Sequence, residues 1–136
     1  MGIPRRPSAA SASALAALLA AAGTTHFVAP GFYDSIVPRV LPGSARNWTL
    51  VSGAAELACA AAVATPRSRR VGATLAAALF VVVFPANIQA VLDAGGGSTA
   101  ARVLAWGRLP LQVPLVWWAL RVRRGAAPVD DPAAPT

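Results

Sequence analysis

Long apolar stretches alternate with short polar or basic segments along the chain. The apolar stretches cover residues 8–28, 48–64, 71–92 and 102–122. An α-helix rises about 1.5 Å per residue, so about 20 residues cross the hydrocarbon core of a bilayer, which is roughly 30 Å thick. The first and third stretches reach this length, and the other two reach it with flanking residues. The pattern predicts an all-α fold, an integral membrane four-helix bundle formed by one domain over residues 8–122.

The segments outside the predicted spans are short and polar. Residues 1–7 form a basic N-terminal lead, and residues 31–47 form a connection of mixed polarity. A basic turn at residues 66–70 joins the second and third spans, and a glycine-rich loop at residues 94–99 precedes the fourth. Residues 123–136 are polar and rich in proline, which predicts a disordered cytoplasmic tail.

Composition points to lipid as the main partner of this chain. Of its 136 residues, 56% are hydrophobic and 12% are charged, whereas soluble domains carry about 25% charged residues. The net charge of +7 comes from arginine alone, clustered between apolar stretches. No basic surface interleaved with aromatic residues is evident, so nucleic acid is not an expected partner. Heavy use of Ala, Arg, Pro and Gly is typical of GC-rich bacterial genomes, which indicates a bacterial cell membrane.

The arginines are distributed unevenly between the two sides of the predicted membrane protein. With a cytoplasmic N-terminus, eight lie inside: Arg5, Arg6, Arg67, Arg69, Arg70, Arg121, Arg123 and Arg124. Four lie outside: Arg39, Arg46, Arg102 and Arg108. Cytoplasmic loops carry the excess of positive charge, so both termini are predicted to be cytoplasmic. A second interpretation stays open, because residues 1–25 also have the basic start, apolar core and small residues of a cleavable signal peptide.

Polar side chains interrupt each of the four predicted spans. They are His26, Glu56, Asn87, Gln89, Arg108 and Gln112. Glu56 lies eight residues after Trp48, or about 12 Å below the outer interface, and Gln112 lies about 9 Å below Trp106. Arg108 lies about 3 Å below Trp106, Asn87 and Gln89 lie about 25–28 Å along the third span, and His26 ends the first span. All four spans therefore place polar groups in the outer half of the bilayer. Such groups are costly in lipid, and their convergence predicts a polar, ligand-binding pocket.

Glu56 is the acidic residue of this predicted pocket. Ser52, Gly53 and Ala60 share its helical face, and a stripe of small residues lets two helices approach closely. Glu56 is therefore expected to point into the bundle, with Arg108 as its partner. Two roles stay open for it: a structural ion pair between helices, or a carboxylate that handles a proton or binds a ligand.

Three further residues carry expectations about local structure. Pro85 lacks an N–H group, so it is expected to bend the third span and free the carbonyl of Val81. Pro110 is expected in the first turn of the fourth helix if that helix begins near Arg108. His26 has no second histidine or cysteine nearby, which favours an interfacial hydrogen bond over a metal site. No metal-binding and no catalytic residue is predicted.

Four segments together resemble the DoxX-like family of small membrane proteins, which includes the MauE proteins. They read THFVAPGFYDSIVPRVLP, SGAAELACAAAVATPRSRRVGA, LFVVVFPANIQAVLD and WGRLPLQVPLVWWAL. The resemblance covers roughly residues 20–122, in order and with matching spacing. It implies four transmembrane helices with a cytoplasmic basic turn between the second and third.

The same resemblance implies a function in membrane redox chemistry. One relative is a subunit of a thiosulfate:quinone oxidoreductase, and others belong to thiol-linked systems. The chain is therefore expected to be an accessory subunit of a quinone- or thiol-linked system, with a membrane-associated oxidoreductase as partner and a quinone as the candidate cofactor. Glu56 matches the family's SGxxE acid. The HF, FPAN and RLPLQ motifs are matched by His26, Pro85, Asn87, Arg108, Leu109, Pro110 and Gln112.

Other functions stay open at this stage. The resemblance brings no catalytic role, and the sequence holds no nucleophile–base set, phosphate loop or cofactor fingerprint, so an independent enzyme is not expected. Cys59 is the single cysteine, which argues against dithiol chemistry within the chain. A membrane scaffold with a purely structural polar cluster is the main alternative. A solute or proton pathway is less favoured, because the inner half of the spans is almost free of polar residues. Homo-oligomerisation is left open.

Overall fold

The structure, a computed structural model, describes residues 9–126, and all regular structure in this range is helical. The elements are α1 (Ala9–Val28), α2 (Pro30–Ile36), α3 (Ala45–Ala64), α4 (Arg69–Val82), α5 (Phe84–Asp93), a 3-10 turn η1 (Ala94–Gly96) and α6 (Thr99–Gly125). The predicted all-α class is confirmed. The predicted N-terminal lead and residues 127–136 of the predicted tail lie outside the described residues.

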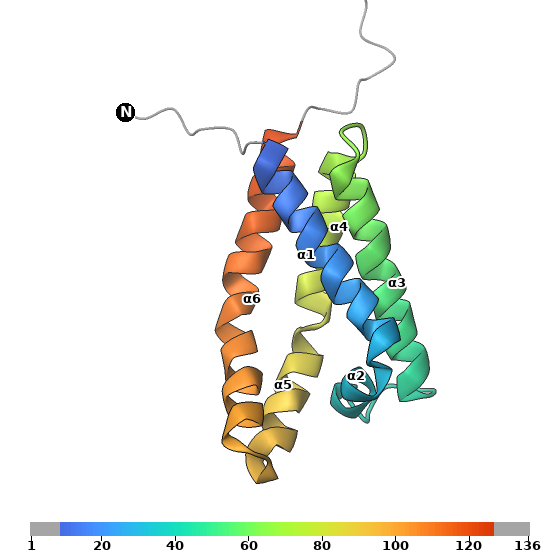
Figure 1. The fold of residues 1–136 in the computed structure, drawn as a ribbon, viewed down its shortest axis with the longest axis vertical. Coiled ribbons are helices and arrows are strands. Elements are labelled where there is room, and N and C mark those ends of the chain that lie inside the picture. Colours follow the sequence, from blue (N-terminus) through green and yellow to red (C-terminus); the bar gives the residue numbers. More distant parts are fainter. Residues whose placement is uncertain (1–8, 127–136) are drawn as a thin grey trace, which may run out of the picture.

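Four long helical segments run along the long axis of the molecule: α1, α3, α4 continued by α5, and α6 (Figure 1). α1 packs on α3, α4 lies against both α3 and α6, and α5 packs on α6. The start of α1 and the end of α6 lie at the same end as the α3–α4 turn (Figure 1). There, the indole Nε1 of Trp118 donates a hydrogen bond of 2.9 Å to the Ser11 hydroxyl. We call this the arginine end, because the arginines at positions 67–70 and 121–124 lie there.

Serine residues fix the starts of two long helices. The Ser44 hydroxyl accepts a hydrogen bond from the backbone N–H of Asn47, and the Ser98 hydroxyl accepts one from Ala101. Each serine satisfies a donor in the first turn that has no partner within its helix. Gly43 precedes the first of these caps with a φ of +86°, a left-handed conformation that favours glycine.

The last helix differs from its prediction at both ends. It begins at Thr99, so Pro110 lies in its interior rather than in its first turn, and Pro114 follows one turn later. The condition for placing Pro110 in the first turn, a start near Arg108, is not met, since the Ser98 cap starts the helix almost three turns earlier. At the other end α6 continues to Gly125, so residues 123–125, assigned to the tail, are helical.

The third predicted span is divided in two at Val83. α4 ends at Val82, and Pro85 lies in the first turn of α5, where its missing N–H costs nothing. This confirms the expected interruption at Pro85. Part of the predicted connection at residues 31–47 is helical. The seven-residue helix α2 begins at Pro30, two residues after α1 ends, and extends to Ile36.

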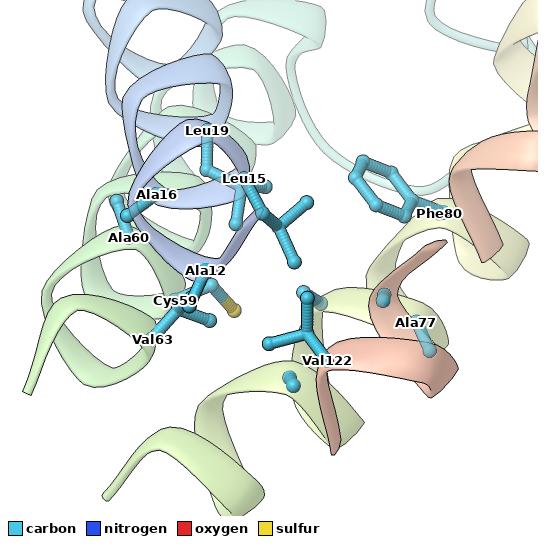
Figure 2. Packing of buried hydrophobic residues seen from close by; sticks show 13 residues of the cluster. Ala12, Leu15, Ala16, Leu19, Cys59, Ala60, Val63, Ala77, Phe80 and Val122 are labelled. Carbon is cyan, nitrogen blue, oxygen red and sulfur yellow. The ribbon is translucent and has the colours of Figure 1, made fainter. Parts of the chain in front are cut away.

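Buried apolar side chains form the main core at the arginine end (Figure 2). They are Ala12, Leu15, Ala16, Leu19, Cys59, Ala60, Val63, Ala73, Ala76, Ala77, Phe80, Ala119 and Val122. Figure 2 shows Leu15, Phe80 and Val122 directed toward one another from three helices. Alanine predominates, so the helices approach closely and the core contains few large side chains. The polar residues of the predicted pocket lie beyond this core, toward the opposite end.

Two helical segments among the described residues are long and apolar enough to cross a membrane. They are α1, with a mean hydropathy of 1.4, and the segment Arg69–Gly96, with 2.2. By the same measure α3 and α6 do not qualify, so two of the four predicted spans are supported. In the most apolar stretch of Arg69–Gly96 only 22% of the residues are buried. A helix this apolar and this exposed lacks the burial expected of a core helix in a soluble protein.

Candidate functional site

A cavity of about 250 Å³ lies between the α1–α3 pair and the α5–α6 pair. Its wall combines side chains from α1 to α6 and is mainly apolar. The lining residues are Leu18, Ala22, His26, Tyr33, Ile36, Val37, Trp48, Thr49, Ser52, Glu56, Phe80, Val83, Ala86, Asn87, Arg108, Leu111, Gln112 and Leu115. We call this cavity the polar pocket. Five of the six residues predicted to form a pocket line it.

His26 and Glu56 meet where α1 crosses α3. His26 Nδ1 lies 3.3 Å from Glu56 Oε2, and the side chains are 9% and 12% exposed. Nδ1 also lies 3.0 Å from the Ala22 carbonyl, so Nδ1 carries the hydrogen and donates it within α1. The predicted pairing of Glu56 with Arg108 is wrong, because His26 occupies the position beside the carboxylate.

Two glycines bring the helices close enough for this contact. A Cβ atom on Gly53 would lie 2.6 Å from the Cβ of His26, and one on Gly23 would lie 2.9 Å from the Gly53 carbonyl oxygen. Real side chains do not tolerate such distances, so α1 and α3 pack this closely only with glycine at both positions. The expected stripe of small residues next to Glu56 is thus the surface against which α1 packs.

The short helix α2 covers His26. The Tyr33 ring stacks on the imidazole at a centroid distance of 3.6 Å and an interplanar angle of 22°. Its hydroxyl lies 2.5 Å from the Thr25 hydroxyl, which itself donates to the Ala22 carbonyl. Tyr33 therefore acts as the donor to Thr25, which fixes the ring over His26. Tyr33 was not predicted from the sequence, although an aromatic pair directly after Pro-Gly is a signal that the segment packs back on the protein.

Asn87 and Gln112 form a hydrogen-bonded amide pair across the pocket's α5–α6 side. Asn87 Nδ2 donates to Gln112 Oε1 at 2.9 Å, and Gln112 Nε2 donates to the carbonyl of Phe80. Phe80 lies at the end of α4, just before the interruption caused by Pro85. The carbonyl engaged by a side chain is therefore that of Phe80, one residue before the expected Val81. This pair joins α4, α5 and α6.

Arg108 and Gln89 occupy less central positions than predicted. The Arg108 guanidinium lines the pocket and lies 5.0 Å above the Phe32 ring, a cation–π contact. Gln89 is not a pocket residue. Its amide donates to Asp93 one turn later in α5, at 3.0 and 3.1 Å to the two carboxylate oxygens. Gln89 was predicted to join the pocket and instead lies on another face of α5.

An ion pair holds the connection between α2 and α3 next to the pocket. Arg46 Nε and Nη2 each lie 2.8 Å from Asp34 Oδ2. The Thr49 hydroxyl, with the Arg46 guanidinium, lowers the pKa of Asp34 below its ordinary value of 3.8, against a smaller opposing effect of desolvation. In the same connection Trp48 Nε1 donates to the Pro42 carbonyl at 2.8 Å. Trp48, Thr49 and Ser52 were not predicted as pocket residues.

The polar pocket combines hydrogen-bonding side chains with a mainly apolar wall. The residues that the structure describes contain no group of three His, Cys, Asp or Glu side chains that could hold a metal ion. Cys59 is buried in the apolar core, away from the pocket lining. The pocket instead offers a carboxylate, an imidazole and two amides around a mainly apolar space. Such a site can hold a small molecule and orient its polar groups.

Comparison with known proteins gives one family. Residues 15–123 match the family described as Domain of unknown function (DUF8561), and the chain belongs to it. The match includes every residue of the polar pocket. No curated protein and no solved structure matches the chain.

Proposed function

We propose that the chain is a multi-pass membrane protein of the bacterial cell membrane, in which α1, α3, α4–α5 and α6 form a four-helix transmembrane bundle. The outward-facing side chains support this arrangement. Val82 and Val113, for example, are 70% and 74% exposed. Soluble monomers rarely expose apolar surface on several long helices, and lipid satisfies such surface without further burial.

The proposed orientation places the arginine end in the cytoplasm. Six arginines of the described residues lie at that end: Arg67, Arg69, Arg70, Arg121, Arg123 and Arg124. Arg39, Arg46, Arg102 and Arg108 lie toward the opposite end, together with Asp34 and Asp93. The excess of positive charge faces the cytoplasm. Trp106, which is 61% exposed, then serves as an anchor at the outer interface, and the polar pocket opens in the outer leaflet.

Reporter fusions test this topology. Alkaline phosphatase folds only outside the cytoplasm, so fusions after Gly43 and Gly97 should be active and a fusion after Arg67 inactive. An active fusion after Arg67 would reverse the orientation. N-terminal sequencing of the purified chain decides whether residues 1–25 are retained, since cleavage would leave three spans.

The proposed activity is the binding of a small, lipid-soluble molecule in the polar pocket. The observation that carries it is a cavity of about 250 Å³ with a mainly apolar wall, onto which His26, Glu56, Asn87, Arg108 and Gln112 converge. An apolar cavity of about 150 Å³ holds benzene, so this one accommodates a substituted ring. Polar groups at a few points of an apolar wall orient a ligand.

The DoxX-like resemblance extends this proposal to redox chemistry. A ring of the quinone type has the size that such a pocket accepts, and quinones are confined to the membrane. The chain would then act as an accessory subunit that presents the ligand to a membrane-associated oxidoreductase. The proposal includes no catalytic activity of its own, since the resemblance implies no catalytic role.

Gentle purification from the native membrane, followed by mass spectrometry of lipids and proteins together, tests this activity. We expect a stoichiometric small molecule in the wild type. Ala22 lines the pocket, so Ala22→Phe should fill it and abolish retention of the molecule. Ala54→Phe is the matched control on an exposed face of α3. Ordinary phospholipid alone in the wild-type sample would count against the proposal.

A scaffold function is the second candidate, and one observation favours it. Asn87, Gln112 and the Phe80 carbonyl already satisfy one another, which is what a purely structural cluster requires. In that case Ala22→Phe would change stability alone. A solute or proton pathway receives less support, because the apolar core cluster closes the bundle at the arginine end.

A further inference from the structure

Four side chains that line the polar pocket donate hydrogen bonds within the protein. His26 Nδ1 donates to a backbone carbonyl of its own helix at 3.0 Å, and Trp48 Nε1 donates to the carbonyl of a neighbouring loop at 2.8 Å. Asn87 donates to Gln112, and Gln112 donates to the end of α4. Arg108 retains free donors, but its guanidinium is held over the Phe32 ring, one helical turn from Gln112.

Three buried side-chain oxygens of the described residues have no hydrogen bond: Asp34 Oδ1, Thr49 Oγ1 and Glu56 Oε2. The Thr49 hydroxyl lies beside Asp34, whose pKa it lowers, and Glu56 is the carboxylate among the three that lines the polar pocket. Glu56 Oε2 is inaccessible to solvent and accepts no hydrogen bond from the described residues. His26 Nδ1 lies 3.3 Å away, but its single hydrogen is directed to the Ala22 carbonyl. A buried acceptor without a donor is destabilising, more so for a charged group. Glu56 lines the pocket, so a molecule in the pocket that carries a donor can bind its carboxylate.

We infer that the polar pocket selects ligands that carry a hydroxyl or N–H group, which donates its hydrogen to the Glu56 carboxylate. This inference rests on the proposed binding function and specifies the chemical class of its ligand. A ring that carries only carbonyl oxygens has no hydrogen to donate. Its oxygens are hydrogen-bond acceptors like those of the Glu56 carboxylate, which therefore repels it. Applied to the redox proposal, the pocket prefers the reduced hydroquinone to the quinone.

Three ring compounds of similar size separate the contribution of the donor from that of apolar burial. Naphthol carries a hydroxyl, methoxynaphthalene replaces its hydrogen with a methyl group, and tetralone offers a carbonyl in the same position. Their binding to the purified full chain in detergent micelles can be measured by equilibrium dialysis, with protein-free micelles as the blank. None of them changes oxidation state under these conditions. We expect naphthol to bind about tenfold more tightly than either other compound, which corresponds to about 1.4 kcal/mol.

Two variants assign the preference to the carboxylate. Glu56→Gln supplies an N–H donor in place of an oxygen, so naphthol should lose most of its advantage and tetralone should gain affinity. Asp93→Asn is the matched control, since it makes the same change outside the pocket, and it should preserve the wild-type order.

The outcomes separate this inference from the proposed function. Equal binding of all three compounds, or a preference for tetralone, would overturn the inference and leave the binding function standing. Failure of all three to bind would overturn both. The series in the wild-type protein decides the matter even if Glu56→Gln does not fold.

Discussion

Gln112→Leu tests whether the amide pair holds three helices together. Gln112 is 8% exposed, accepts from Asn87 at 2.9 Å and donates to the Phe80 carbonyl. Leucine has a similar size, so the change removes both hydrogen bonds with little loss of packing. It leaves the Asn87 amide and the Phe80 carbonyl without partners in the middle of the molecule.

The expected magnitude follows from the two lost bonds. A hydrogen bond contributes about 1 kcal/mol net in soluble proteins, and interhelical ones in membranes average about 0.6 kcal/mol. Gln112→Leu should therefore lower the free energy of unfolding by about 1–2 kcal/mol. Asn87→Leu removes one bond and should cost about half as much. The double variant should be less destabilised than the sum by about 0.6–1 kcal/mol, because the shared bond is counted twice in the single variants.

Reversible unfolding in mixed micelles, titrated with SDS and followed by circular dichroism, measures all four proteins of this double-mutant cycle. Gln89→Leu is the control. It removes an amide bonded within its own helix, and its effect should stay within about 0.5 kcal/mol. Additive effects of Asn87→Leu and Gln112→Leu, or a Gln112→Leu protein as stable as the wild type, would refute the interpretation of the pair as a link between helices.

The remaining predictions concern the helix crossing, the outer connection and the core. Gly53→Ala should lower the free energy of unfolding by about 1–3 kcal/mol and weaken naphthol binding, because the new Cβ would lie 2.6 Å from the Cβ of His26. Its control is Gly107→Ala, where a Cβ has no atom within 4 Å, and this change should be neutral or slightly stabilising in the same titration. The lowered pKa of Asp34 stabilises the fold above its ordinary value of 3.8 and is lost as the pH falls below that value. The difference in unfolding midpoint between wild type and Asp34→Asn should therefore shrink on acidification, and a constant difference would contradict this. Val63→Ala, at a fully buried core position, should lower the free energy of unfolding by about 1–2 kcal/mol without altering naphthol affinity. Weaker naphthol binding in equilibrium dialysis would contradict the view that the core and the pocket are independent.

Depth along a helix was predictable from the sequence, because it requires only the rise per residue. The helices α1 and α3 begin and end within a few residues of their predicted limits, and five of six polar residues reach one cavity. The interruption at Pro85 was predictable for a local reason, the missing N–H group. The all-α class follows from the same long apolar stretches.

Orientation around each helix was not predictable in the same way. Glu56 meets His26 rather than Arg108 because Gly23 and Gly53 set the crossing of α1 and α3, a relation between residues distant in sequence. Gln89 lies on the wrong face of α5 for the pocket. The helix α2 is too short to be predicted from its own pattern of apolar and polar residues. Its position is set by tertiary contacts such as the stacking of Tyr33 on His26.

The position of the pocket follows from where the helices converge. At the arginine end, alanine-rich faces and the Trp118–Ser11 hydrogen bond bring α1 and α6 together. Farther along, α1 stays on α3 while α5 stays on α6, and the interruption at Val83 lets α5 take a direction different from that of α4. The two pairs diverge beyond the core, and polar side chains face the space between them. Because the core packs without the Glu56 side chain, Glu56 can remain a buried acceptor without a donor beside this space.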